Sequence, residues 1–253
     1  MRYEQYATRA GTGHKPAWLA AAALVLTLVA GAAGAAAPPE VSPATTMAEA
    51  GMVDIRSLVP DIAEDIKYAG HDNFTGAPVP GYDAAKCFLL KPVAQALARV
   101  EHALRKKHMR LKIWDCYRPT RAVAAFMAWA QDLDDLSTKA AHYPNVPKSD
   151  IVDDGYVARV SNHSRATTVD LTLMHCDEHG KHCQPFDMGT HFDLFDPRAH
   201  TDSKQVTATE HANRQMLLKA MAAQGFKNYP GEWWHYTLVM HPQPQTLYNV
   251  PVR

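Results

Sequence analysis

The spacing of apolar positions along the chain predicts three helices. Apolar residues recur at helical spacing over residues 91–108, 118–133 and 209–224. Pro119 suits the first turn of the second helix, because proline needs no backbone hydrogen bond there. Gly225 follows the third segment and is typical of a residue that ends a helix.

Alternation of apolar and polar residues predicts strands over residues 52–58, 111–116, 169–173 and 234–240. In the third strand, valine and leucine occupy one face, and Asp170 lies among threonines on the other. Helices and strands are interspersed without a regular βαβ rhythm. The sequence therefore predicts a single α+β domain in which helices pack on a mostly antiparallel sheet.

The first part of the chain is typical of a secretory signal peptide, expected over residues 1–32. Arg2 and Arg9 precede an apolar stretch, and small residues that fit an A-x-A cleavage pattern follow it. An uncleaved membrane anchor is the alternative, although the stretch is shorter than the roughly 20 residues that span a bilayer. Residues 33–50 are expected to form a flexible lead-in and residues 51–253 the folded domain. The protein is thus expected in the periplasm, with no stable membrane span after cleavage.

Composition excludes some classes of partner. Lys and Arg together number 26, as do Asp and Glu, so no basic excess suggests nucleic-acid binding. Apolar residues make up 47% of the chain, which is enough for a substantial core. The sequence leaves the oligomeric state open.

Four cysteines in an exported protein indicate two disulfides. The short polar segment between Cys176 and Cys183 favours a local bridge, which leaves Cys87 with Cys116, although the sequence alone permits three pairings. Histidines within and beside the 176–183 segment offer a second metal site as an alternative to an oxidised hairpin.

Two separated polar motifs supply the residue types of a catalytic zinc site. The first contains His163 and Asp170, and the second contains Glu232 and His235. Two histidines and an aspartate provide three protein ligands and leave one position open. Glu232 is surplus to that set and suits a general base, and the two tryptophans beside it favour a water-poor wall that raises a carboxylate's pKa. A metal-free core strand with a hydrogen-bonded histidine is the alternative for the second motif.

Arg118 is a third polar feature, at the junction of a predicted strand and a predicted helix. Such junctions commonly place side chains in clefts. The planar guanidinium can bind an oxyanion or a carboxylate there. Taken alone, an arginine at this position is more typical of a structural surface residue.

The motifs together resemble the VanX-type D-alanyl-D-alanine dipeptidases, zinc enzymes related to the lysostaphin and hedgehog zinc fold. The resemblance covers nearly all of residues 54–251. It is carried in chain order by residues 73–76, 78–79, 81–82, 115–119, 163–165, 169–173, 188–190, 192–193 and 232–236. Several stretches in the same order are more specific than any one of them.

The resemblance implies one zinc ion per chain, with His163, Asp170 and His235 as its ligands and Glu232 as the catalytic base. Arg118 matches the arginine that stabilises the tetrahedral transition state. These roles agree with the chemistry that the residue types themselves suggest, a metal-activated water with a base and a cationic group.

The resemblance also implies the substrate contacts. Asp193 matches the carboxylate that receives the free amino group of the substrate, and Ser161 and Tyr156 match positions that line the dipeptide pocket. Two residues depart from the family pattern. Ala166 replaces a glycine, at a cost on the order of 1 kcal/mol if that backbone needs a positive φ, and Thr168 replaces a small residue near the metal.

The implied activity is hydrolysis of D-Ala-D-Ala or a similar small D,D-dipeptide in cell-wall turnover. One rival is a peptidoglycan D,D- or L,D-carboxypeptidase that acts on longer peptides, and Asp193 argues against it because it selects short substrates with a free amine. The other rival is a non-catalytic zinc-binding module, which would need neither Glu232 nor Arg118.

Overall fold

A computed structural model describes residues 40–253. The predicted signal peptide and residues 33–39 lie outside the described residues. The rest of the predicted lead-in contacts the domain, since the Ser42 backbone N–H donates to the carbonyl of Leu247 at 2.8 Å and the Leu247 N–H donates to that of Glu40 at 2.9 Å. No helix among residues 40–253 combines the length and apolar character needed to cross a bilayer.

The domain is built on a six-stranded sheet with strand order β2-β4-β5-β8-β7, where β6 pairs with β5 outside this path. The strands are β2 (Ala63–Glu64), β4 (Met109–Asp115), β5 (Thr168–His175), β6 (Gln184–Pro185), β7 (Phe226–Asn228) and β8 (His235–Leu238). Only β2 and β4 pair in parallel, so the predicted mostly antiparallel sheet is confirmed. A separate two-stranded antiparallel sheet joins β1 (Met52–Asp54) to β3 (Phe88–Leu90).

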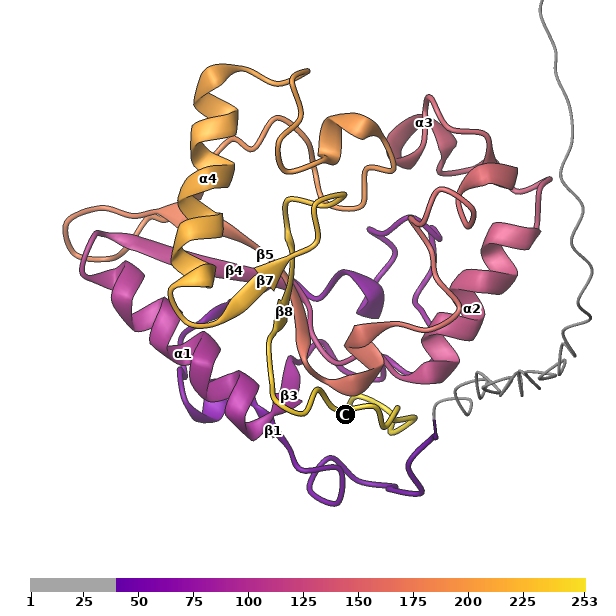
Figure 1. Ribbon diagram of the computed structural model, residues 1–253, viewed down its shortest axis with the longest axis horizontal. Coiled ribbons are helices and arrows are strands. Elements are labelled where there is room, and N and C mark those ends of the chain that lie inside the picture. The colour runs from indigo at the N-terminus through magenta and orange to yellow at the C-terminus, as the bar shows by residue number, and fades with distance from the viewer. Residues whose placement is uncertain (1–39) are drawn as a thin grey trace, which may run out of the picture. The chain divides into compact units, whose positions relative to one another are not determined.

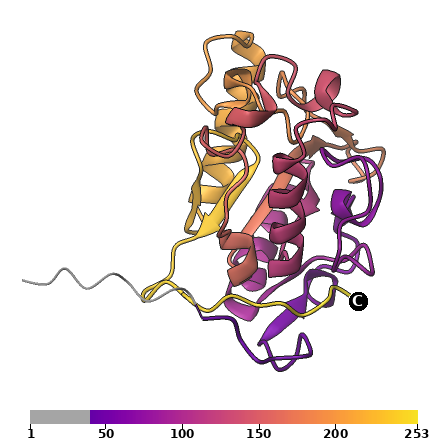
Figure 2. The ribbon, with the colours of Figure 1, turned by 90° about the vertical axis from the view of Figure 1, so that its right-hand side faces the viewer.

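Helices cover both faces of the large sheet. Figure 1 shows α1 (Lys91–Arg105) and α4 (Ala208–Ala222) together on one side. Figure 2 shows α2 (Thr120–Gln131) on the opposite side, and α3 (Lys139–His142) is a single short turn. All three helices predicted from periodicity are present. The start of α4 is fixed by a capping box, in which Thr207 and Glu210 each accept a hydrogen bond from the other's backbone N–H.

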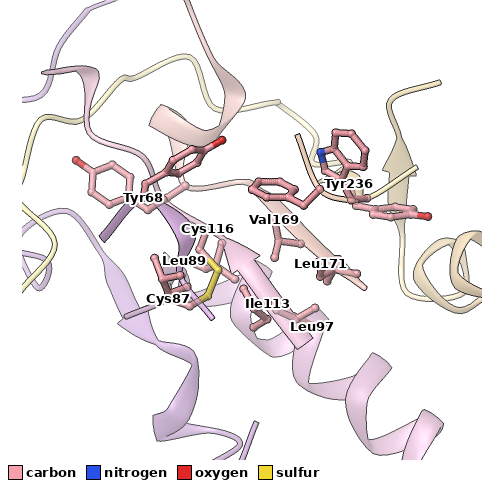
Figure 3. Packing of buried hydrophobic residues seen from close by; sticks show 14 of the residues in the cluster. Tyr68, Cys87, Leu89, Leu97, Ile113, Cys116, Val169, Leu171 and Tyr236 are labelled. Carbon is pink, nitrogen blue, oxygen red and sulfur yellow. A yellow bond between two sulfur atoms is a disulfide. The ribbon is translucent and has the colours of Figure 1, made fainter. Parts of the chain in front are cut away.

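The alternation predicted for β5 sorts its side chains onto two faces. Val169, Leu171 and Leu173 are fully buried against the α1 side of the sheet, where Figure 3 shows two of them in the core. Asp170 points to the other face and pairs in register with His235 of β8. Residues that pair directly across two strands share a face, so the sheet itself brings these two side chains together.

The strand predicted over residues 52–58 is shorter than expected, because β1 ends at Asp54. The Asp54 carboxylate accepts a hydrogen bond from the Arg56 backbone N–H and caps a 3-10 helix over Ile55–Ser57. Aspartate side chains offer the backbone such local alternatives to a strand ladder, which the alternation of apolar residues does not reveal.

Both predicted disulfides are present. Cys87 bonds to Cys116, and Cys176 bonds to Cys183. The second bridge closes the hairpin that joins β5 to β6. The first is buried in the core, and the carbonyl of its Cys116 lies against His163.

Candidate functional site

A short turn brings His163 back toward β5. The segment Asn162–Arg165 is a 3-10 helix, and the Ser161 hydroxyl caps it by accepting from the His163 backbone N–H at 3.2 Å. The chain then reverses at Ala166, whose φ of 54° is left-handed. The sequence predicts this reversal, and the strain expected for alanine at a positive φ is present in the structure, on the order of 1 kcal/mol.

His163, Asp170 and His235 converge on one point. The His163 Nε2 lies 3.2 Å from Asp170 Oδ2, and the His235 Nδ1 lies 3.1 Å from Asp170 Oδ1. The two ring nitrogens are 3.4 Å apart. All three ligand atoms lie within 4.8 Å of one another, so a single ion can contact each of them.

The tautomer of His163 is set by its surroundings. Its Nδ1 lies 2.6 Å from the backbone carbonyl of Cys116 and 3.3 Å from Asp115 Oδ2. A carbonyl oxygen only accepts, so Nδ1 carries a proton, and in the neutral ring the lone pair is then on Nε2. This is the arrangement by which proteins orient a histidine that binds a metal.

Asp170 shows that these residues fit a cation. Its side chain is only 3% exposed, and its Oδ1 has no hydrogen bond of acceptable geometry among residues 40–253, although His235 lies nearby. Burial alone would raise the pKa of this carboxyl, but the two imidazoles hold it well below its usual range. A buried charge with an unsatisfied oxygen is costly, and two imidazoles with one carboxylate are a common ligand set for zinc.

Glu232 lies in the turn that precedes β8. Its backbone N–H donates to the carbonyl of Tyr229 at 3.0 Å, and its own carbonyl accepts from the Asn228 side chain at 2.9 Å. The carboxylate is 12% exposed, and its Oε2 lies 3.4 Å from His235 Nδ1. Burial raises the pKa of Glu232 to about 7, which suits a group that takes and returns a proton near neutral pH.

Arg118 projects into the same space from the segment between β4 and α2. Its Nε donates to Asp115 Oδ2 at 3.0 Å, and its Nη2 lies 2.9 Å from the same oxygen and 3.6 Å from Asp170 Oδ2. The guanidinium also lies over the rings of Tyr68 and Phe126, at 5.0 and 4.9 Å from their centroids. These contacts fix a positive charge beside the three candidate ligands.

Asp193 is a buried carboxylate that lines the same cavity. It is 5% exposed and has a left-handed backbone with φ of 57°. The Tyr68 hydroxyl donates to its Oδ2 at 2.8 Å. Burial, together with the nearby carboxylates of Asp170 and Glu232, raises the pKa of Asp193 well above its usual value. Among residues 40–253 no ion pair compensates this carboxylate, so a cationic group brought by a ligand would find a favourable position there.

All eight residues predicted for the site line one cavity of about 270 Å³. They are Arg118, Tyr156, Ser161, His163, Asp170, Asp193, Glu232 and His235. Phe74, Phe126 and Phe195 add an apolar wall. A larger cavity of about 850 Å³ is lined in part by Lys112, Trp114 and Thr172, and none of the eight residues contributes to it.

Two residues of the site were not found from the sequence. Tyr68 holds Asp193 and lies under Arg118, and Asp115 accepts from Arg118 and from the Tyr82 hydroxyl at 2.6 Å. Tyr68 lies in a short 3-10 helix with no distinctive pattern around it. Asp115 is a polar residue at the end of a predicted strand, and this pattern predicts a cleft position for Arg118 but assigns no role to Asp115 itself.

Two histidines, an aspartate, a glutamate and an arginine around one small cavity define a site of the metallopeptidase class. The family model described as D-ala-D-ala dipeptidase, peptidase M15, matches residues 48–253. The chain therefore belongs to this family.

Individual relatives agree with the family match. The chain is 45% identical to a D-alanyl-D-alanine dipeptidase of Streptomyces coelicolor over 78% of its own length and 96% of that protein. It is 39% identical to one from Enterococcus faecalis, over 81% and 99%, and 36% identical to one from Enterococcus faecium, over 81% and 100%. A solved structure of the vancomycin-resistance D,D-pentapeptidase VanY with Zn(II) overlaps 64% of this chain and 78% of that one, at 15% identity and a TM-score of 0.37, too weakly to support an argument.

Proposed function

We propose that this protein hydrolyses D-Ala-D-Ala or a similar small D,D-dipeptide with one zinc ion per chain. One observation carries the proposal: a cavity of about 270 Å³ is lined both by the three converging ligands and by the buried carboxylate of Asp193, which has no ion-pair partner among residues 40–253. The family membership and the dipeptidase relatives support the same activity.

The proposed zinc ligands are His163, Asp170 and His235. Zinc in such a site polarises a substrate carbonyl and lowers the pKa of water. Glu232, whose carboxylate lies 3.4 Å from His235, then accepts a proton from the attacking water and returns it to the amine that leaves. Its pKa of about 7 allows both transfers near neutral pH.

Arg118 stabilises the negative charge that develops on the carbonyl oxygen of the substrate. Asp115 and the rings of Tyr68 and Phe126 hold the guanidinium in place before the reaction begins. A charge fixed in a water-poor site stabilises a transition state more than a mobile one, because nothing has to reorganise.

Asp193 binds the free amino group of the dipeptide, and Tyr68 keeps its carboxylate oriented. Ser161 and Tyr156 line the remaining part of the cavity. An ammonium group supplies the positive charge that the buried carboxylate lacks, whereas an acylated nitrogen does not. The site therefore favours short substrates with a free amino terminus over stem peptides of the cell wall.

The charges within the cavity support a cation and an ammonium together. Three carboxylates that line the cavity, those of Asp170, Asp193 and Glu232, lie near the guanidinium of Arg118, and Asp115 pairs with the same guanidinium from beside the cavity. When all are ionised the excess is three negative charges. A divalent metal ion and one substrate ammonium bring three positive charges to the same place.

We also propose that the protein is exported to the periplasm and that its signal peptide is removed. The pattern of residues 1–32 and the two disulfides support it, because disulfides persist mainly in oxidising compartments. Sequencing the N-terminus of protein recovered from the periplasm tests this part. Cleavage near residue 32 is expected, and an intact N-terminus on a cytoplasmic protein would contradict it.

Amine release from three substrates tests the activity. D-Ala-D-Ala should be cleaved in the zinc-loaded protein and not after chelation, L-Ala-D-Ala tests the configuration of the first residue, and N-acetyl-D-Ala-D-Ala should be cleaved poorly. If the acetylated substrate or a pentapeptide is cleaved as well as D-Ala-D-Ala, the protein is a carboxypeptidase and not a dipeptidase. Zinc binding without hydrolysis of any peptide would favour a non-catalytic module.

A further inference from the structure

The carbonyl that orients His163 belongs to Cys116, which lies just beyond the end of β4 and is not paired in the sheet. The pairing of β4 with β5 shifts register between Ile113 and Asp115, and β4 ends at Asp115. Cys116 therefore follows the last regular ladder contact. Its carbonyl nevertheless has to stay 2.6 Å from His163 Nδ1 to keep the proton on that nitrogen.

A disulfide, and not the hydrogen bonds between strands, fixes the position of Cys116. It joins Cys116 to Cys87, the residue directly before β3. The half-cystines are 1% and 0% exposed, and Figure 3 shows the bond packed beside Leu89 and Ile113. The neighbouring Tyr117 N–H donates to the carbonyl of Phe88 in β3 at 3.0 Å and adds one backbone contact to the same strand.

The same strand also supports the turn that carries His163. The Leu90 N–H donates to the carbonyl of Ala166 at 3.1 Å, and the Ala166 N–H donates to the carbonyl of His163 at 2.9 Å. β3 thus contacts Tyr117, directly after Cys116, and Ala166, at the end of the turn that carries His163. The disulfide is the only covalent link between β3 and the segment that follows β4 among the described residues.

We propose that the Cys87–Cys116 disulfide is a positioning element of the zinc site, a role that rests on the metal binding proposed above. It holds the Cys116 carbonyl against His163 Nδ1, so that Nε2 stays unprotonated and faces Asp170 and His235. Without the bridge, Cys116 keeps only the backbone contacts of its neighbours Tyr117 and Arg118. Its carbonyl can then shift, and His163 also populates the tautomer with a proton on Nε2, which cannot bind zinc through that nitrogen. Loss of a group that orients a ligating histidine typically weakens metal binding by about 10–100-fold.

The chain contains its own matched control. Cys176–Cys183 closes a hairpin at the far end of β5, and neither cysteine lines the 270 Å³ cavity. Cys87→Ala/Cys116→Ala and Cys176→Ala/Cys183→Ala make the same chemical change at two places. Zinc affinity of each folded variant is measured by competition with a chromophoric chelator. We expect the first variant to bind about 10–100-fold more weakly than wild type and the second to stay within about threefold.

A second readout separates positioning from general stability. In the metal-free protein, nitrogen-15 NMR of the histidine rings should show His163 as the Nδ1–H tautomer in wild type and in the hairpin control. A mixture of tautomers is expected in Cys87→Ala/Cys116→Ala. A change of overall stability alone would leave the tautomer of the folded state unchanged.

Each outcome decides the proposal. Unchanged zinc affinity and tautomer in a folded Cys87→Ala/Cys116→Ala variant would overturn it. Cys87→Ala/Cys116→Val, which refills the space of the bridge, is the second variant should the first not fold. If both fail to fold while the hairpin control folds, the bridge serves global stability and the proposal is wrong. Absence of zinc binding in wild type would instead refute the proposed function.

Discussion

Acetylation of the substrate's amino group removes the charge that Asp193 is proposed to bind. Asp193 is 5% exposed and close enough to Asp170 and Glu232 for both to raise its pKa. A neutral acetamide would leave the Asp193 charge buried with the Tyr68 hydroxyl but without a cationic partner, at a cost of roughly 3–5 kcal/mol. We therefore expect N-acetyl-D-Ala-D-Ala to be cleaved with a kcat/KM lower by about two to three and a half decades.

The corresponding change in the protein is Asp193→Asn. It keeps the shape of the side chain and removes its charge, so it should reduce kcat/KM for the free dipeptide most and shrink the ratio between the two substrates. The assay is D-alanine release, quantified with the same product for both substrates. Asp202→Asn serves as the control, because that side chain is 79% exposed and does not line the cavity.

The reasoning fails if wild type cleaves both substrates with similar kcat/KM, because the carboxylate would then have no ammonium to bind. It also fails if Asp193→Asn lowers both rates equally, which would indicate a role in folding or in the chemical step. The expected pattern is a loss confined largely to the substrate with a free amine.

Three further changes test other parts of the site and the fold. Glu232→Gln should retain zinc and lose about 10²–10⁴-fold in kcat, and a rate within a few-fold of wild type would place the base elsewhere. Tyr68→Phe removes the hydroxyl that holds Asp193 at 2.8 Å, so KM for D-Ala-D-Ala should rise about tenfold with a smaller effect on kcat; an unchanged KM would contradict its orienting role. The Glu64 side chain is buried, and Arg56 Nε lies 3.2 Å from its Oε2, but neither carboxylate oxygen has a hydrogen bond of acceptable geometry among residues 40–253. Burial outweighs the Arg56 charge and raises the pKa of Glu64 to about 7. Because the folded state favours the protonated acid, the stability contributed by Glu64 is fully present below the unfolded pKa of about 4.5 and is lost as the pH rises through about 7. Glu64→Gln should therefore be more stable than wild type by about 1–2 kcal/mol at pH 8, after allowance for partial solvent exposure, and equal to it near pH 4; denaturant unfolding that gives the same difference at both pH values would contradict this.

Much of the fold was predictable because its signals are local. The helix α1, predicted over residues 91–108 and observed over Lys91–Arg105, the two faces of β5 and the turn at His163 each follow from spacing or from turn residues in one short window. The candidate ligands were predictable for a similar reason. An aspartate on a strand face and a histidine on the next strand have few roles other than pairing with a cation or with each other.

What the sequence left open depends on contacts between distant segments. Tyr68 meets Asp193 across 125 residues of sequence, and Tyr82 meets Asp115 across 33. The repeats of apolar residues that predict strands and helices, with periods of two and 3.6 residues, carry no information about contacts between distant segments. The register shift in β4, which frees Cys116 to face His163, likewise results from packing between β4 and β5.

Zinc titration of the stripped protein tests the central claim most directly. The protein is freed of metal with a chelator, zinc is added back in steps, and D-alanine release from D-Ala-D-Ala is measured at each step. Because His163, Asp170 and His235 form one group of converging ligands among the described residues, we predict that activity rises linearly and stops rising at one zinc per chain. Hydrolysis by the metal-free protein, or no hydrolysis at any amount of zinc, would contradict the account.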